Sequence, residues 1–292
     1  MAFDNLRHRL MRLRAASSPS SPARCWRWSR AATILLMVAA LGGAMLSGAC
    51  ATASKRPPVG ALDPDKFLWE RGTRELDAKH WLNAREYFRN LMDSYPQSPY
   101  RADAKLGLAD AYLGENSAES KVLAINEYRE FLSFYPIHAR ADYAQFKLGM
   151  AHYYQMFGPE RDQTETREAI AELKVMVERY PNSALRAEAL QRLREARDRL
   201  SDAEYRVGYF YVRTQKFPPA AVDRLSALLK EDPNYSRRDA VYFYLADSYV
   251  KLNRKAEALP YLERLIAEFE QSEYLADAKI LAASLKAELA QK

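Results

Sequence analysis

The chain has 292 residues, of which 44 are basic and 38 are acidic, so its formal net charge is +6. Seven of the basic residues and one acidic residue precede residue 50, so the rest of the chain carries 37 of each sign. A nucleic-acid-binding domain concentrates cations on its functional surface, and this balance therefore excludes DNA or RNA as a partner.

Residues 1–49 are predicted to be an export signal. Seven arginines precede an apolar run from Ala31 to Leu46, which is too short to span a bilayer and has the length of a signal-peptide core. The run ends in Leu46-Ser47-Gly48-Ala49-Cys50. This ending resembles the lipobox of bacterial lipoproteins, which implies that Cys50 carries the lipid and anchors the mature protein in outer-membrane lipid.

Two other interpretations of the leader are an ordinary secretory signal that ends near a cysteine and a membrane-anchored helix. The leader is long, and Met11 is an alternative start. Ala51 stands where an Asp would resemble an inner-membrane retention signal, so the resemblance favours the periplasmic face of the outer membrane. Because Cys25 leaves with the leader and Cys50 is lipidated, we expect no disulfide and no thiolate metal site.

Residues 50–64 are predicted to be a lipidated tether, because they are rich in proline and contain little that forms a core. Folding is expected to start near Asp65. From there to Lys292 the chain is rich in Ala, Leu, Arg and Glu and shows no alternating strand pattern. This composition predicts an all-α domain.

A proline-ended segment recurs along this domain. The prolines are separated by 40 to 52 residues, somewhat more than a tetratricopeptide repeat, and they are Pro96, Pro136, Pro181 and Pro233. Twelve residues before each proline stands an alanine, and four residues after that alanine comes a large side chain. These pairs are Ala84/Phe88, Ala124/Tyr128, Ala169/Leu173 and Ala221/Leu225. One helical turn separates each pair, so the alanine permits close helix contact and the larger residue fills the space beside it.

First helices carry a matching small residue, and the last repeat keeps Ala258 and Leu262 but lacks its proline. The small residues are Gly72, Ala109, Gly149, Gly208 and Ala246. The pattern resembles a tetratricopeptide-repeat solenoid of about five helix pairs. We assign repeats 1–3 to residues 65–183 and repeats 4–5 to residues 184–292.

Insertions distinguish this chain from a generic repeat protein. The segment 114–117 predicts a lengthened loop in the second repeat, and the segment 157–164 predicts a longer one in the third. Between Ser183 and Gln215 the only Gly or Pro is Gly208. One helix of roughly thirty residues is therefore expected to join the two groups of repeats.

In the order and loop lengths of its repeats the chain resembles the BamD family, the lipoproteins of the machinery that assembles β-barrel proteins in bacterial outer membranes. Five segments carry the resemblance, and they are residues 131–149, Arg161-Asp162, residues 179–183, residues 197–200 and residues 204–211. The resemblance covers nearly all of the mature chain. The chain departs from the family at Pro218-Pro219 and at its C-terminus, which has no final Tyr-Pro.

The resemblance implies a periplasmic scaffold that binds the POTRA domains of BamA, other lipoproteins of the complex and unfolded outer-membrane proteins. Arg224 matches a family arginine that matters for the BamA contact, and its planar fork suits a carboxylate. Asp223, Glu204 and Tyr205 are assigned to the same partner-binding group. A solvent-exposed Arg224 with no such role is the alternative.

In the family the N-terminal repeats face incoming substrates. Aromatic residues there are candidates for binding the aromatic C-terminal signal of a barrel protein. Most of them occupy repeat packing positions, whereas Trp69 and Tyr100 lie off those positions and are the predicted substrate-binding residues.

No catalytic residue, metal site or cofactor is predicted. The mature chain has only His80, His138 and His152, which are too scattered to pair, and it has no phosphate loop or nucleophile elbow. A periplasmic repeat adaptor that coordinates cell-wall enzymes with the outer membrane is the alternative function, and a lipoprotein enzyme is a third. The adaptor class typically carries a coiled coil and an ordinary signal, and neither is found in this sequence.

Overall fold

The computed structural model describes residue 57 and residues 62–291, and this part of the chain contains eleven α-helices and no β-strand. The predicted signal peptide, the predicted lipidation site Cys50 and most of the predicted tether lie outside the described residues. The helices are α2 (Pro64–Asp77), α3 (Trp81–Ser94), α4 (Arg101–Glu115), α5 (Ala118–Phe134), α6 (Ala141–Tyr153), α7 (Thr164–Arg179), α8 (Arg186–Arg213), α9 (Pro218–Glu231), α10 (Arg238–Lys251), α11 (Lys255–Glu268) and α12 (Leu275–Ala290).

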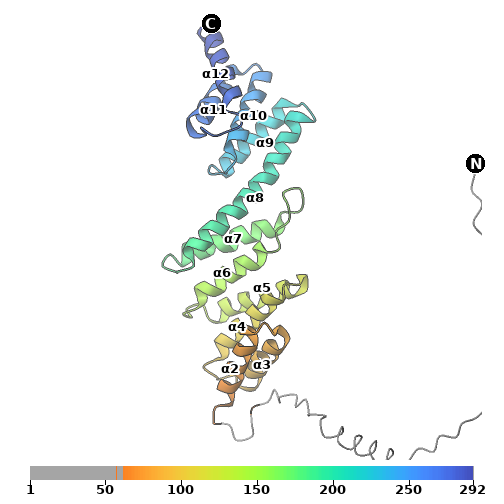
Figure 1. Ribbon diagram of the computed structural model, residues 1–292, viewed down its shortest axis with the longest axis vertical. Helices are drawn as coiled ribbons and strands as arrows, with labels where there is room; N and C mark the ends of the chain where they lie inside the picture. The colour runs from red at the N-terminus through yellow and green to blue at the C-terminus, as the bar shows by residue number, and fades with distance from the viewer. Residues whose placement is uncertain (1–56, 58–61, 292) are drawn as a thin grey trace, which may run out of the picture. The chain divides into compact units, whose positions relative to one another are not determined.

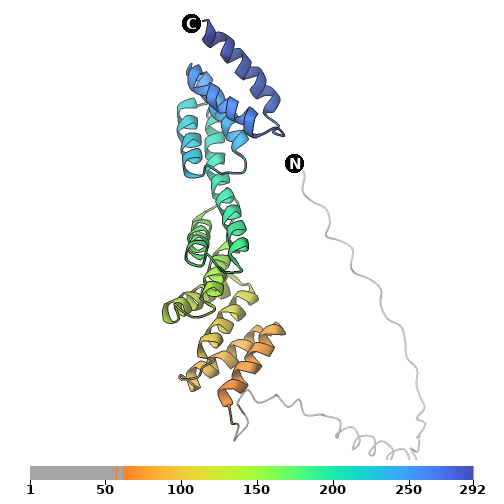
Figure 2. The same cartoon turned by 90° about the vertical axis from the view of Figure 1, so that its left-hand side faces the viewer.

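Each helix packs mainly against its neighbours in sequence, and the helices stack in chain order from α2 to α12 (Figure 1, Figure 2). This arrangement confirms the predicted all-α tetratricopeptide-repeat solenoid. Five helix pairs run from α2 to α11. The sequence did not predict α12 as a separate helix; it packs on α11 and buries Ala278, Ala282 and Leu285. Its packing covers the apolar side that the last pair cannot bury alone.

The predicted small and large residues meet at the helix interfaces. All four alanines of the second helices are fully buried, as are their large partners. A Cβ added to Gly208 would collide with Leu225 Cδ2, and one added to Gly149 would lie 2.8 Å from Leu173 Cδ2. Since real Cβ contacts do not approach so closely, these glycines allow the two helices of a pair to pack without strain.

The loop lengths agree with the sequence at one of two places. Ten residues, 154–163, separate α6 from α7, so the long loop of the third repeat is confirmed. The lengthened loop predicted after segment 114–117 is wrong, because only Asn116 and Ser117 separate α4 from α5. Asn116 ends α4 in the left-handed region at φ 62°, and Ser117 Oγ accepts a hydrogen bond from Ser120 N at 3.0 Å. The C-cap of α4 and the N-cap of α5 are therefore adjacent residues, which keeps the loop short. The additional residues of this repeat lie in α5, which has 17 residues.

The expected joining helix is α8, which has 28 residues and spans about 42 Å at 1.5 Å per residue. Its first half contributes Ala189 and Leu193 to a core shared with α6 and α7. Its second half contributes Val212 to a larger core that extends through α12. One continuous helix therefore belongs to two hydrophobic cores and fixes the C-terminal repeats to the preceding ones.

No helix in the described part of the chain is long and apolar enough to cross a membrane. The departure at Pro218-Pro219 is accommodated at the start of a helix, since Pro218 is the first residue of α9. A proline there sacrifices no helical hydrogen bond.

Candidate functional site

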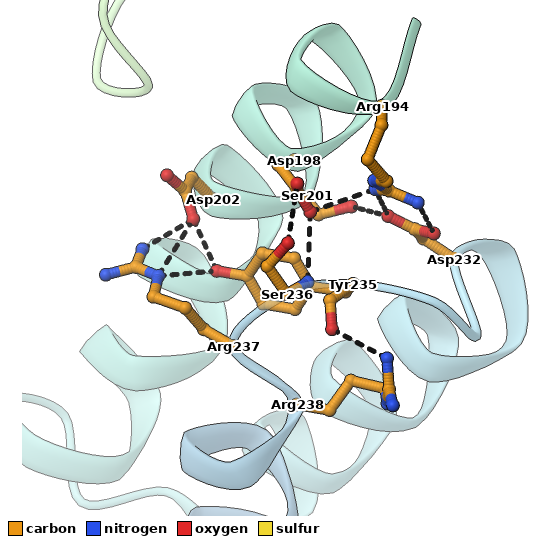
Figure 3. A network of polar contacts seen from close by, with 9 residues as sticks. All are labelled: Arg194, Asp198, Ser201, Asp202, Asp232, Tyr235, Ser236, Arg237 and Arg238. Carbon is orange, nitrogen blue, oxygen red and sulfur yellow. Dashed lines mark hydrogen bonds and ion pairs between the residues drawn. The ribbon is translucent and has the colours of Figure 1, made fainter. Parts of the chain in front are cut away.

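The middle of α8 is bound to the loop that precedes α10 by a network of charged and hydroxyl groups (Figure 3). Arg194 donates two hydrogen bonds to Asp232, one of them from Nη1 to Oδ1 at 2.9 Å. The same guanidinium reaches Asp198 Oδ1 at 3.0 Å, and Ser201 Oγ donates to Asp232 Oδ2 at 2.7 Å. Both Asp232 oxygens are therefore satisfied from α8.

The second half of the network holds the segment that enters α10 (Figure 3). The buried Tyr235 donates its hydroxyl to Asp202, and Arg237 Nε donates to the same carboxylate at 3.1 Å. Ser236 donates to Asp198 through its backbone N at 3.0 Å and its Oγ at 2.6 Å. The loop is thus anchored at several points, which sets the orientation of α10 relative to α8.

The electrostatics of the network favour its charged form. Burial acts to raise the pKa of Asp232, but the hydrogen bonds from Arg194 and Ser201 outweigh burial and leave that pKa below its ordinary value. Burial and the neighbouring Asp202 carboxylate raise the pKa of Tyr235, so its hydroxyl stays a donor. The network is therefore a structural clamp at neutral pH.

Next to this clamp, the pair formed by α8 and α9 exposes a mixed surface. Arg224 and Asp223 on α9 are exposed, and within the described residues Arg224 has no hydrogen bond or ion pair. The stem of Arg224 lies beside Gly208, since a Cβ added there would be 3.7 Å from Arg224 Cβ. On the same stretch of α8, Val207 and Phe210 are 38% and 43% exposed.

The two other predicted partner-binding residues lie on α8 in different surroundings. Glu204 is half-buried one turn before Gly208. Tyr205 packs against the C-terminal core, with its ring 5.9 Å from Tyr209 and the Arg237 guanidinium 5.5 Å from its centre. Burial raises the pKa of Tyr205. The structure therefore places Arg224 and Asp223 on the open surface and gives Tyr205 intramolecular contacts.

The predicted substrate-binding residues meet at the other end of the described chain. The Trp69 and Tyr100 rings stack with centroids 5.0 Å apart and planes 20° apart. Both are half-buried and pack against the N-terminal core. They form one rigid aromatic pair there, in a different core from Arg224.

One group in the described residues has the atoms for a metal site, but an arginine occupies it. Ligand atoms of His152, Glu168 and Glu172 lie within 4.8 Å of one another. Arg129 Nη2 is 3.7 Å from Glu168, 3.6 Å from Glu172 and 3.3 Å from His152 Nε2. Glu165 faces His152 Nδ1 at 2.8 Å. The guanidinium supplies the positive charge that these groups require, and we assign the cluster a structural role.

A recurring serine in the loops between repeats was not predicted from the sequence. Ser98, Ser183 and Ser272 each donate a hydrogen bond of 2.6–2.7 Å to an aspartate of an earlier first helix, and these aspartates are Asp65, Asp142 and Asp239. Each serine also accepts from the backbone N two residues later. The signal was present as a serine four residues after the end of α3, α7 and α11, but the aspartates lie 33 to 41 residues away.

Comparisons with known proteins match these helices. The model of the YfiO family, described as outer membrane lipoprotein, matches residues 62–259. The outer membrane protein assembly factor BamD of Caulobacter vibrioides is 29% identical over 76% of this chain and 72% of its own length. The BamD of Neisseria gonorrhoeae is 24% identical over 84% of this chain and 94% of its own.

Similar solved structures include the TPR2AB domain of yeast Sti1, described in complex with pHSP90. It has a TM-score of 0.40 and 13% identity, and the match covers 76% of this chain and 98% of that one. A kinesin light chain with nearly identical TPR-like repeats from Podospora has a TM-score of 0.37 and 16% identity, over 73% of this chain and 100% of that one.

Proposed function

Because the chain belongs to the YfiO family of outer membrane lipoproteins, we propose that it is a periplasmic scaffold of the machinery that assembles β-barrel proteins in the outer membrane. The observation that carries this proposal is the family match, which runs from the start of α2 into α11 and so covers at least part of every described hydrophobic core. In this role the chain works by holding partners together and not by catalysis.

The partner proposed for the C-terminal repeats is BamA, through its periplasmic POTRA domains. Arg224 supports this contact because its guanidinium is exposed and unpaired, whereas Arg194 and Arg237 nearby are committed to aspartates. A carboxylate on the partner would receive two hydrogen bonds from the planar fork. Val207 and Phe210 supply exposed apolar area on α8, and Asp223 and Glu204 provide acceptors for partner donors.

The N-terminal repeats are proposed to receive unfolded outer-membrane proteins. The stacked Trp69 and Tyr100 support this because a half-buried aromatic pair keeps a fixed orientation and still leaves ring surface for an incoming aromatic side chain. Replacing both with alanine is expected to weaken binding of a peptide that ends in an aromatic residue. Unchanged affinity would exclude this pair.

We propose that a lipid on Cys50 inserts into the outer membrane and attaches the protein there. Other lipoproteins of the complex are proposed as neighbouring partners at the membrane. Single acyl chains anchor weakly, so stable attachment requires several chains on this residue. Cys50→Ala is expected to release the protein into the soluble periplasm. Full retention of the variant in the membrane fraction would refute the anchor.

Depletion of the protein tests the function as a whole. Loss of barrel proteins from the outer membrane is the expected result. Intact barrels together with a defect in the cell wall or in division would support the adaptor alternative instead.

The BamA contact is tested by Arg224→Glu and co-purification from outer membranes. Charge reversal is expected to reduce recovery of BamA at least tenfold, because it places a carboxylate against a carboxylate. Arg167→Glu is the matched control, since Arg167 on α7 is also exposed and its side chain has no partner in the described residues. Equal recovery of BamA with both variants would remove Arg224 from the interface.

A further inference from the structure

A cavity of about 350 Å³ opens where the end of α8, the turn before α9 and the last turns of α10 meet. Its charged lining consists of Arg213, Lys216, Lys251 and Asp247. None of the residues assigned above to BamA or to substrates lines this cavity. Its volume falls within the range of small-ligand sites in proteins, which bury an apolar group beside a few polar ones.

The cavity lining has three basic side chains and one acidic side chain, so its net charge is positive. Lys251 Nζ pairs with Asp247 Oδ2 at 2.6 Å, which accounts for the only carboxylate among the lining residues. Arg213 lies over the faces of Tyr209 and Tyr244, at 5.9 and 5.6 Å from the ring centres, and has no carboxylate partner in the described part of the chain. Lys216 also has none within the described residues. Two cations therefore face the cavity without an anion.

The part of the cavity wall that α10 contributes is aromatic and preformed. Phe243 stacks on Tyr274 with ring centroids 5.0 Å apart, and Tyr244 contacts both Tyr209 and Tyr274. These contacts hold the wall in one orientation before any ligand arrives, which lowers the entropic cost of binding. Beyond the cavity, Phe217 in the α8–α9 turn is 55% exposed and extends the apolar surface.

We propose that this cavity binds a peptide carboxylate that is adjacent to an apolar side chain in an extended segment of polypeptide. Arg213 and Lys216 receive the carboxylate, and Phe243 and Tyr244 receive the apolar group. The net neutrality of the chain after residue 50 argues against a polyanion as the ligand, because a local pair of cations matches one carboxylate and not a repeating charge. Two sources have this chemistry, namely an Asp or Glu side chain and a free chain terminus.

Isothermal titration calorimetry with the full chain in detergent and three eight-residue peptides tests the proposal. One peptide carries an internal Glu-Phe and an amidated end, the second replaces its Glu with Gln, and the third ends in Phe with a free carboxylate and has no other acid. At least one carboxylate peptide is expected to bind with a Kd below about 1 mM, and the second peptide at least tenfold more weakly. Binding of the first assigns the side chain as a source. Binding of the third assigns the terminus where the double variant with Arg213→Gln weakens it, because a peptide that ends in Phe can also bind at Trp69 and Tyr100.

Variants locate the binding in the cavity. Lys216→Gln, in an exposed turn, and the double variant with Arg213→Gln are each expected to reduce affinity, the double variant at least tenfold. Lys230→Gln on α9 is the control, because Lys230 lies outside the cavity. Circular dichroism verifies that each variant is folded. If folding requires the contacts of Arg213 with the two tyrosines, Lys216→Gln alone still tests the proposal. Equal binding of all three peptides, binding of none, or unchanged affinity in the folded variants would overturn the proposal without affecting the BamA test.

Discussion

The loops that precede α6 and α10 occupy the same place in their repeats but differ in the burial and polarity of their side chains. Before α10, Asp232 and Tyr235 are buried and bound to α8 by the clamp described above. Before α6, Ile137 is 97% exposed and the preceding Phe134 is 67% exposed. The loop before α10 is thus attached firmly to α8. The loop at the equivalent position before α6 exposes apolar side chains to solvent instead.

Buried carboxylates near these two loops also differ in their partners. Asp110 accepts hydrogen bonds from Tyr128 and from Tyr143, the latter at 3.0 Å, and burial raises its pKa. Asp232 is buried too, but the Arg194 guanidinium lowers its pKa overall. Asp232 is therefore held by a charged partner where α8 joins the two groups of repeats, whereas the hydrogen bonds to Asp110 come from neutral tyrosine donors.

The largest effect is expected from Asp232→Ala. This change leaves Arg194 and Ser201 without their shared acceptor, and we expect the free energy of unfolding to fall by about 3 kcal/mol. Urea denaturation followed by circular dichroism measures it. Glu231→Ala, at the exposed end of α9, is the control and should change stability by less than about 0.5 kcal/mol. Similar losses in both variants would contradict a clamp centred on Asp232.

Lowering the pH should change the stability of the two regions differently, because the pKa values of Asp110 and Asp232 are shifted in opposite directions from 3.8. The lowered pKa of Asp232 gives stabilisation that is present above pH 3.8 and is lost as pH falls through its folded-state pKa. The raised pKa of Asp110 gives stabilisation that is present below pH 3.8 and is lost as pH rises through its folded-state pKa. Acidification should therefore weaken the α8–α10 region relative to the α4–α6 region.

Hydrogen exchange at several pH values, corrected for intrinsic rates, measures this difference helix by helix. Asp232→Asn should flatten the pH dependence of α10, and Asp110→Asn should flatten that of α6. A parallel loss of protection in both regions of the unmodified protein would show that the two carboxylates do not behave differently.

A smaller effect is expected from His138→Ser. This change tests whether the loop before α6 lacks a stabilising hydrogen bond that serine provides in other repeats. His138 stands where other repeats have serine, and its Nδ1 accepts from Arg140 N at 3.2 Å as those serines do. It donates nothing to Asp103, which Arg140 reaches at 3.4 Å instead. A serine hydroxyl would restore the bond, and we expect stability to rise by about 0.5 kcal/mol after loss of the ring contact with Phe131.

The same denaturation assay measures this change, with Ile137→Ser as its control. Because Ile137 is almost fully exposed, its replacement should leave stability unchanged. If His138→Ser is destabilising, the ring contacts of the histidine matter more than the missing serine bond.

The sequence alone determined the five helix pairs, the close contacts within each pair and the approximate length of α8. These features depend on local spacing: an alanine and a larger residue four positions apart lie on one face wherever the helix is placed. Gly208 and Leu225 could therefore be assigned to the same interface from the repeat pattern alone. The exposure of Arg224 also agrees with its place in the second-helix pattern.

Only the tertiary structure decided which polar groups meet between repeats. Arg194 and Asp232 lie 38 residues apart, and Tyr235 and Asp202 lie 33 apart, so their contact depends on how α8 and α9 stack and on the path of the loop. The same stacking brings Arg213 and Lys216 to one cavity with Phe243 and gives Tyr205 its packed position. Helical periodicity is a short-range property, whereas hydrogen bonds between repeats need the register of the stacked helices, and packing of the whole solenoid fixes that register.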